Sequence, residues 1–355
     1  MRFIHLADVH LGMQPDIKRD WSQARSKEIW KTFENVINQC EEESVDLLLI
    51  AGDLFHKQPL LRELKEVNYL FKRLTKTHVV MMAGNHDYIG QTSNYINFPW
   101  AENVHMFEQE ELATYYIEEI NTRIYGLSYL TRDIAEAKYH QSVLLNPREI
   151  SILLAHGGDE KNIPIDRKTI VRLGYTYVAL GHIHKPTKFS NQMAYAGSLE
   201  PLDKTETGEH GYIQGDISRY GDEFHTDITF IPCSTRQYIS LVIEVQPQMT
   251  QLEVMDMICE QIRSRGMNHI YSIVLEGARD VDVSFDVDEI VTLGYIVDVE
   301  DFTIPDYDFD ELRIENRNNI IGMYIDKIRS LEYDDEVIDK ALYLGVKALM
   351  KQNQR

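Results

Sequence analysis

The chain contains several short runs of apolar residues, and each run is followed within three residues by a polar residue that can bind a metal ion. Short apolar runs of this kind are typical of strands that are buried on both faces inside a packed sheet. We therefore expect each run to form such a strand. The runs are Phe3–Ala7, Val45–Ile50, Val79–Met82, Ile150–Leu154 and Tyr175–Leu180.

The polar residues that follow these strands are predicted to gather in one place. Ligands of open α/β sheets bind at the carboxyl ends of the strands, so side chains at those ends converge on one crevice. Asp8 and His10 are two positions apart, as are His182 and His184. Residues at that spacing point to the same side of an extended chain. The candidate metal ligands are Asp8, His10, Asp53, Asn85, His156, His182 and His184.

Carboxylates, imidazoles and a carboxamide at the end of a sheet are suited to hydrolysis with two metal ions. Two cations roughly 3.5 to 4 Å apart activate a water molecule and neutralise the charge that develops on a phosphodiester. Mixed ligands of this kind suit manganese, iron or zinc, and a thiolate site is excluded because no Cys lies in these segments. We expect Asp53 to bridge the ions, with Asp8, His10 and His184 on one ion and Asn85, His156 and His182 on the other.

Each motif taken alone also has an ordinary structural explanation. A single Asp-X-His or Gly-Asp is usually part of a turn, and Gly84–Asp87 alone fits an Asn-containing turn. Turn chemistry does not easily produce five such segments in succession, each after a buried strand. The other histidines, such as His5 within the first strand, are expected to be structural or exposed to solvent.

These motifs resemble those of a known family, the Mre11/SbcD DNA repair nucleases of the calcineurin-like metallophosphoesterase superfamily. The resemblance covers roughly the first 235 residues and fills every metal position. Tyr195–Pro201, followed by Gly208–Gly211, is similar to the segment that closes the catalytic domain in that family. The motifs that carry the resemblance are Asp8–Gly12, Gly52–Pro59, Gly84–Asp87 and Gly181–His184.

The resemblance implies a DNA exonuclease or endonuclease that acts in DNA repair with two Mn²⁺ ions, for which Fe, Zn or Mg are alternatives. His86 would protonate or stabilise the leaving 3′ oxygen, and Asp87 would orient the His86 ring. His56 would help to seat the phosphate. The expected partners are DNA and an SMC- or Rad50-like coiled-coil ATPase.

The pattern along the chain predicts an α/β fold, a two-sheet αββα metallophosphoesterase sandwich with a small α+β cap domain and C-terminal helices. Apolar residues at helical spacing in Asp20–Cys40 and Leu60–Leu74 predict helices that cover a sheet. Short strands between Ala194 and Val245 are expected to form the second sheet. In the cap, a helix is expected over Met249–Arg265, with Gly266 as its stop and with Leu252, Met255, Cys259 and Ile262 facing inward.

Four regions are predicted. Residues 1–235 would form the metallophosphoesterase domain, 236–302 a cap that presents DNA, 303–313 an acidic linker and 314–355 a helical tail that binds a partner. The tail would contain helices over Ile314–Leu331 and Asp335–Lys351.

An amphipathic tail can pack on its own chain or bind another, and we expect Ile321, Ile325 and Ile328 to form a partner face. The family resemblance also suggests a homodimer, with Leu60–Leu74 and Tyr95–Trp100 as candidate contacts.

The net charge is the main objection to a nuclease. The 355 residues carry a formal charge of −21, and DNA binding depends on phosphate contacts to Lys and Arg. Eleven acidic and no basic residues lie between Val281 and Glu311, so this stretch is expected to face away from DNA. Bound cations would offset the carboxylates of the site. Lys18, Arg19, Arg25, Lys57, Arg62 and Lys185 flank the motifs as candidate phosphate contacts.

The same motifs also bear on two other possible functions, a different phosphoesterase and a non-enzymatic scaffold. A phosphoprotein phosphatase or an enzyme acting on a small nucleotide could use the same metals, but Asp53 is followed by Leu54-Phe55-His56 rather than Asp-Arg-Gly. A non-enzymatic scaffold would be favoured by a missing ligand. The chain contains no run of ~18 apolar residues, so we expect neither a membrane span nor a signal peptide. Its three cysteines are scattered, which indicates reduced thiols. The expected location is cytoplasmic.

Overall fold

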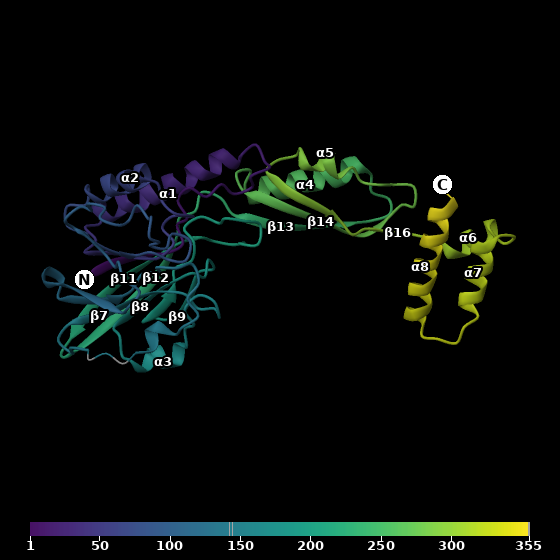
Figure 1. Cartoon of the computed structure of the whole chain (residues 1–355). Helices are drawn as coiled ribbons and strands as arrows, with labels where there is room; N and C mark the ends of the chain where they lie inside the picture. The colour runs from purple at the N-terminus through teal and green to yellow at the C-terminus, as the bar shows by residue number, and fades with distance from the viewer. Residues whose placement is uncertain (142, 144, 354–355) are drawn as a thin grey trace. The chain divides into compact units, whose positions relative to one another are not determined.

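The computed structural model describes residues 1–141, 143 and 145–353 of the chain (Figure 1). The chain divides into two compact units. The first contains residues 1–239 and 268–270, and the second contains residues 240–267 and 271–355. All candidate metal ligands lie in the first unit.

The first sheet of the first unit has six strands. Strands β1 to β4 of this sheet run parallel to one another. On the other side of β1, strands β11 and β12 extend the sheet, and each runs antiparallel to its neighbour. In spatial order the strands are β12 (Glu223–Pro232), β11 (Gly211–Tyr220), β1 (Arg2–Leu6), β2 (Leu47–Ala51), β3 (His78–Met82) and β4 (Val104–Met106).

The second sheet also has six strands, and its centre is parallel. An antiparallel strand closes each side of this parallel centre. In spatial order the strands are β5 (Ala113–Ile117), β6 (Thr122–Gly126), β7 (Ile150–His156), β8 (Tyr177–Gly181), β10 (Met193–Tyr195) and β9 (Thr187–Ser190).

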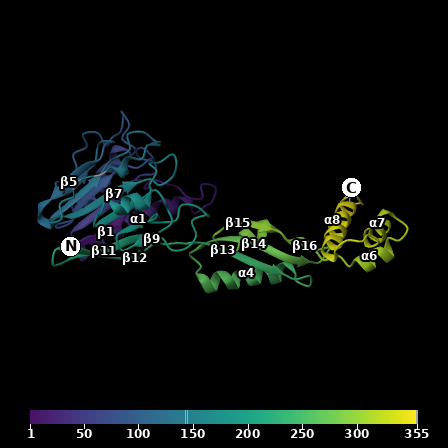
Figure 2. The same ribbon diagram turned by 90° about the horizontal axis from the view of Figure 1, so that it is seen from below.

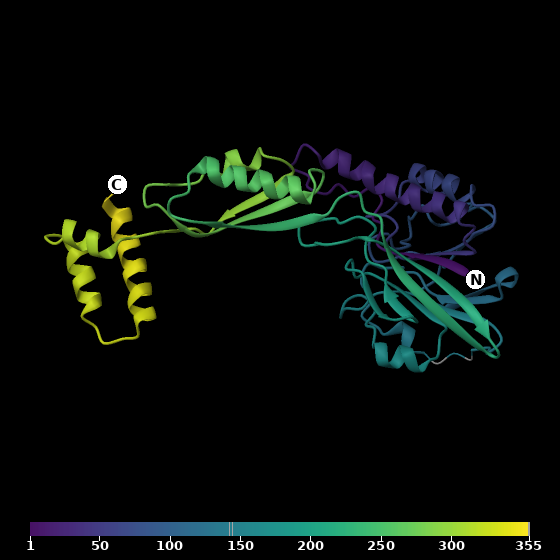
Figure 3. The same ribbon diagram turned by 180° about the vertical axis from the view of Figure 1, so that it is seen from behind.

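Alternation along the strands of the first sheet explains why helices and the second sheet cover its two faces. Phe3 and Leu49 belong to the core shared with the second sheet, whereas Ile4 and Leu48 belong to the core shared with the helices. The helical layer consists of α1 (Ser22–Glu42) and α2 (Leu61–Phe71), which Figures 1 and 3 show against the first sheet. The short helix α3 (Arg167–Arg172) follows β7 on the side of the second sheet. The predicted αββα sandwich is therefore confirmed.

The strands between Ala194 and Val245 differ from the prediction. We expected them to make the second sheet, but β11 and β12 pair with β1 in the first sheet, with Arg2 opposite Asp216. The second sheet is instead built around β7 and β8. An apolar pattern predicts that a segment is a strand, but it does not predict which strand lies beside it. The pairing of β1 with β11 joins segments that are distant in sequence.

The second unit begins with a sheet in the order β13, β14, β15, and two helices lie on one face of it (Figures 1 and 2). The helix predicted over Met249–Arg265 is present, but Leu252 is 68% exposed. The predicted inward residue Ile262 is buried, and Val254 and Ile258 complete the buried side of the helix. The elements are β13 (Tyr238–Val245), α4 (Gln251–Arg265), β14 (Ile270–Arg279), α5 (Val287–Val291), β15 (Ile296–Asp301) and β16 (Ile304–Pro305).

The C-terminal part of the second unit contains α6 (Phe309–Glu315), α7 (Ile320–Arg329) and α8 (Asp335–Asn353). The stretch 303–313 is therefore not only a linker, since it contains β16 and the start of α6. The single helix expected over Ile314–Leu331 is broken, because the Asn319 side chain accepts a hydrogen bond from the Ile321 amide and begins a new helix there.

The apolar stripe of the tail faces inward. Ile321 and Ile325 are buried against Leu342 and Val346 of α8, so they form the core of the α6–α8 helices rather than an open partner face. Among the described residues, no helix is both long and apolar enough to cross a membrane.

Candidate metal centre

The candidate ligands lie at the carboxyl ends of strands from both sheets. In the first sheet, Asp8 and His10 follow β1, Asp53 follows β2, and Asn85 follows β3. In the second sheet, β7 ends at His156, and β8 ends at Gly181, directly before His182. The sequence predicted the position of each residue after its strand, but it did not predict that two different sheets contribute them.

Several of these residues have a left-handed backbone. The φ angle is 51° at Asp8 and His10, 50° at Asp53 and 97° at His182. A non-glycine residue in this region is held there by its surroundings, and such residues cluster at functional sites. The amide of His10 donates a hydrogen bond of 3.0 Å to the Asp53 carbonyl. The amide of His182 donates to both oxygens of the Asp8 carboxylate, at 3.0 and 2.9 Å. These bonds fix neighbouring ligands against one another.

Asp53 lies between the two predicted groups of ligands. Its Oδ2 is 3.8 Å from His10 Nε2 and 3.4 Å from His156 Nε2, and the residue is 1% exposed. Its other oxygen, Oδ1, accepts a hydrogen bond from the His86 amide. One oxygen is thus fixed by the backbone while the other faces imidazoles from both groups.

Candidate ligand atoms from different residues converge within hydrogen-bonding distance of one another. Nε2 of His10 lies 3.1 Å from Nε2 of His184. Oδ1 of Asn85 lies 2.9 Å from Nε2 of His156 and 3.0 Å from Nδ1 of His182. In Asp8, His10 and His184 the ligand atoms lie within 4.8 Å of one another, as they do in Asp53, His156 and His182. This donor set fits two divalent cations.

A second hydrogen bond fixes the tautomer of three imidazoles. Nδ1 of His156 lies 2.8 Å from the Ala51 carbonyl, Nδ1 of His184 lies 2.6 Å from Glu206, and Nε2 of His182 lies 2.7 Å from Asp159. Each acceptor binds the N–H and leaves the lone pair of the other ring nitrogen for a cation. Sequence reasoning missed Glu206 and Asp159, because their contacts with His184 and His182 join loops that are distant in sequence.

The catalytic candidates lie beside His10. The His86 ring centroid is 4.8 Å from that of His10 and 5.3 Å from that of His56. Together, His10, His56 and His86 form a third group whose ligand atoms lie within 4.8 Å. Both His56 and His86 are partly exposed, unlike the buried His10, so they are accessible to a substrate.

The predicted role of Asp87 does not match its contacts. Its carboxylate accepts hydrogen bonds from the amides of Gly84 and Phe55 and from the Tyr95 hydroxyl. Nδ1 of His86 lies 3.1 Å from the His56 carbonyl instead. Asp87 therefore fixes the loop that follows β3, and a backbone carbonyl orients the His86 ring. The pair is adjacent in sequence, and adjacency alone does not make two side chains meet.

Electrostatics within the site follow from burial and from the carboxylates. Burial lowers the pKa of His156, but the Asp53 charge outweighs it and the pKa is raised to about 9. Burial also lowers the pKa of His184, yet hydrogen bonding to Glu206 and the Asp8 charge raise it to about 9. Burial raises the pKa of Asp53, but the imidazoles around it, first His156, hold it far below the usual range. Asp53 is therefore an anion at neutral pH.

Two glycines are required by close approaches within the site. A Cβ at Gly84 would lie 2.3 Å from Oδ1 of Asp53, and a Cβ at Gly181 would lie 1.9 Å from the Ala51 carbonyl oxygen. Any side chain at either position would displace a ligand strand.

One predicted phosphate contact is excluded. Arg25 is fully buried, and its guanidinium binds Glu28, Glu200 and the Pro201 carbonyl. A cation that is paired inside the protein cannot meet a phosphate at the surface. Basic side chains near the ligands occur elsewhere: Arg132 and Lys161 line a cavity of about 630 Å³ that reaches Asn85.

The fold and the site together define the class of this protein. Residues 1–186 match the model of the calcineurin-like phosphoesterase family, and the chain belongs to that family. It is a metal-dependent phosphodiesterase.

The chain is similar to several proteins in this class. It is 28% identical over 312 residues to the uncharacterized metallophosphoesterase YhaO of Bacillus subtilis, covering 78% of this chain and 72% of that protein. It is 26% identical to the DNA double-strand break repair protein Mre11 of Archaeoglobus fulgidus, covering 78% and 65%, respectively. With Mre11 of Methanopyrus kandleri it shares 28% identity over 62% of this chain and 55% of that protein. The chain thus spans between about half and three quarters of these relatives, and the resemblance to Mre11 is confirmed.

Proposed function

We propose that this protein is a manganese-dependent DNA nuclease that acts in DNA repair. The observation that supports this most is the arrangement of two ligand groups around the Asp53 carboxylate, with the partly exposed His56 and His86 beside them. Relatives named as DNA double-strand break repair proteins support the choice of DNA.

In this proposal, one ion would be held by Asp8, His10, His184 and Asp53, and the other would be held by Asn85, His156, His182 and Asp53. Bound cations would supply an activated water and neutralise charge on the phosphate. His56 would hold a phosphate oxygen. His86, whose Nδ1 faces the His56 carbonyl, would donate a proton from Nε2 to the leaving oxygen.

A small nucleotide is the alternative substrate, and one observation favours it. The cavity of about 630 Å³ beside Asn85 is lined by Arg132 and Lys161 and also by Asp133 and Glu160. A polar cavity of this size, with donors and acceptors in balance, suits a single nucleotide.

The test incubates the full chain and Mn²⁺ with labelled linear DNA, and in parallel with a small phosphodiester. We expect cleavage of both, and loss of both in Asp53→Asn by more than the roughly 10- to 100-fold that follows loss of an outer partner of a ligand. Tyr220→Phe serves as a matched control, because Tyr220 is 68% exposed and far from the ligands in sequence. Cleavage of the small ester alone would favour the nucleotide, and unchanged rates in Asp53→Asn would exclude the proposed centre.

We also propose that the α6–α8 helices bind a coiled-coil ATPase. Because Ile321 and Ile325 are buried, the contact would use the outer apolar residues. Ile320, Met323 and Leu344 are 65%, 67% and 57% exposed. A chain ending at Asp306, before α6 begins, should keep metal-dependent hydrolysis and lose the ATPase in a binding assay. Retained binding would place the contact elsewhere.

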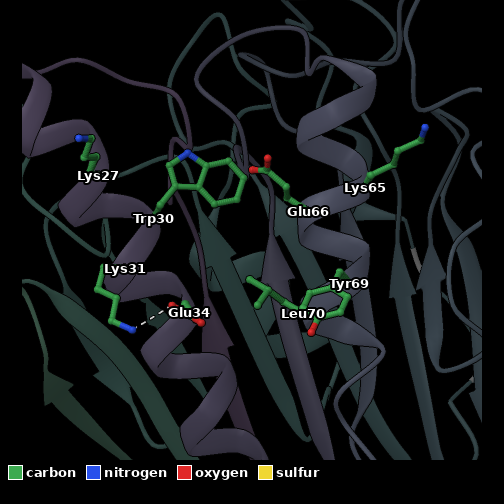
Figure 4. Close-up of a pocket in the computed structure, with 8 residues that line it drawn as sticks. All are labelled: Lys27, Trp30, Lys31, Glu34, Lys65, Glu66, Tyr69 and Leu70. Carbon is green, nitrogen blue, oxygen red and sulfur yellow. Dashed lines mark hydrogen bonds and ion pairs between the residues drawn. The ribbon is translucent and has the colours of Figure 1, made fainter.

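A homodimer is proposed through the outer side of α1 and α2. The predicted Tyr95–Trp100 contact is less suitable, since Tyr95 and Phe98 are buried. Figure 4 shows the side chains that line a groove between the two helices. The groove has a volume of about 540 Å³, and Tyr69 on its wall is 66% exposed. Tyr69→Glu should convert the dimer to a monomer in sedimentation experiments, and an unchanged mass would exclude this surface.

A further inference from the structure

We infer that Asp159 is a positioning residue that orients His182 for metal binding and joins this ligand to the loop that forms one wall of the cavity beside Asn85. The inference rests on the proposed role of His182 as a metal ligand. It assigns to the Asp159 carboxylate two tasks, one for each of its oxygens. Oδ2 of Asp159 receives the Nε2–H of His182 at 2.7 Å and a longer hydrogen bond, of 3.2 Å, from the Asn162 side-chain amide. Oδ1 organises the backbone that follows.

The contacts of Oδ1 are all within its own loop. It accepts hydrogen bonds from the amides of Lys161 and Asn162 at 2.7 and 2.9 Å, and from the Asn162 side-chain amide at 3.2 Å. The loop is then joined to a neighbouring one, because the Ile134 amide donates to the Lys161 carbonyl and the Ile163 amide donates to the Ile134 carbonyl. The cavity wall that carries Lys161 and Asn162 is therefore ordered from Asp159.

The contact of Oδ2 decides which ring nitrogen of His182 is available. A carboxylate only accepts hydrogen bonds, so the proton of a neutral His182 must be on Nε2, 2.7 Å away. Nδ1 then carries a lone pair, and it lies 3.0 Å from Oδ1 of Asn85, another acceptor. Two acceptors in contact need a cation between them. Asp159 thus produces the tautomer that a metal ligand requires.

Glu206 makes the same kind of contact on the other side of the site, and it supplies a matched comparison. Its Oε1 lies 2.6 Å from Nδ1 of His184, and its Oε2 accepts hydrogen bonds from the Ser198 hydroxyl and the Leu202 amide. Each carboxylate therefore holds one imidazole with one oxygen and a loop with the other. The two imidazoles belong to different ligand groups, so changes at Asp159 and Glu206 should affect different ions.

The decisive variant is Asp159→Asn. Its carbonyl oxygen can keep the Oδ1 contacts and hence the loop, but its NH₂ group would donate to Nε2 of His182 and move the ring proton to Nδ1. The proton would then occupy the direction of the cation. Manganese titration of the full chain should show the site of Asn85, His156 and His182 weakened roughly 10- to 100-fold, with the other site unchanged. Glu206→Gln should show the converse, and Asp222→Asn, which removes an exposed carboxylate from another loop, should match the unaltered protein.

A spectroscopic measurement separates this role from a purely structural one. Nitrogen NMR of the metal-free protein reports which ring nitrogen of His182 carries the proton. We expect Nε2–H in the unaltered protein and Nδ1–H in Asp159→Asn, with equal melting temperatures. The same tautomer in both proteins, or equal affinity at both metal sites, would overturn the inference. The tautomer is measured without metal, so a failure of the unaltered protein to bind manganese would count against the proposed function alone.

Discussion

At the scale of single residues, the site is built from backbone conformations that the chain would not adopt alone. A non-glycine residue in the left-handed region costs of order 1 to 3 kcal/mol, and this conformation occurs at Asp8, His10, Asp53 and His182. Hydrogen bonds between neighbouring ligand loops offset this strain. The protein's own hydrogen bonds therefore contribute to fixing the positions of the candidate ligands.

His86 should separate binding from chemistry. Its ring is not in either ligand group around Asp53, and its amide rather than its side chain contacts Asp53. His86→Ala should therefore retain both metal ions and lose roughly 10² to 10⁴ in turnover, the range of a general acid. Metal content by elemental analysis and the rate of DNA cleavage test this together. Loss of an ion in the variant would instead make His86 a ligand.

Metal affinity should depend on pH because protons occupy two of the ligands. The pKa values of His156 and His184 are both raised to about 9, and a metal ion binds only the deprotonated rings. Manganese affinity should thus rise from pH 6.5 toward pH 9, by roughly tenfold per pH unit for each proton displaced. The metal-free protein has the opposite dependence. A His pKa raised on folding stabilises the fold fully below 6.5, and this contribution is lost as pH rises through about 9.

Calorimetric titration of manganese in buffers of different ionisation enthalpy would count the protons released. A pH-independent affinity without proton release would show that the two imidazoles are already neutral in the metal-free protein.

The sequence predicted the position of each candidate ligand because a polar residue shortly after a buried strand is a local signal. It did not predict Asp159, Glu206 or the contacts of Asp87, since these depend on where loops meet in space. His182 and Asp159 are separated by a helix and a strand, and no local pattern records their contact.

At the scale of elements, alternation and helical spacing predicted most of the helices and strands but not their partners. The strands β11 and β12 were recognised as strands and assigned to the wrong sheet. In the tail, the sequence predicted the apolar stripe but not the surface that covers it. Ile321 and Ile325 pack against α8 of the same chain. Periodicity shows that a face is buried, whereas the identity of the covering surface depends on contacts distant in sequence.

The burial of Ile325 leads to a prediction for the α6–α8 helices. Ile325→Ala should destabilise them by roughly 2 to 5 kcal/mol, the usual range for a buried isoleucine, because Ile325 is fully buried in a small core. Met323→Ala, at a position 67% exposed, should change stability by less than about 0.5 kcal/mol. Hydrogen exchange of residues 309–353 measures both. Equal protection in the two variants would show that this core does not stabilise the tail.

At the scale of the whole molecule, the most acidic stretch and the candidate metal ligands lie in different units of the chain. The eleven acidic residues between Val281 and Glu311 all lie in the second unit, whereas every candidate ligand lies in the first. The formal charge of −21 therefore describes the chain as a whole better than it describes the surface around the site.

The division of the ligands between β1, β2 and β3 on one side and β7 and β8 on the other has a mechanical consequence. Each ion would act as a non-covalent cross-link between the two layers of the sandwich, so that unfolding the first unit requires its release. An ion at 100 times its dissociation constant should add about 2.7 kcal/mol to the stability of the fold, and raise Tm by roughly 5 to 10 °C. Calorimetry with manganese and with a chelator would measure this difference. A chelated protein with the same Tm would mean that the layers hold together without help from the ions, and that the metal centre is only a place for chemistry.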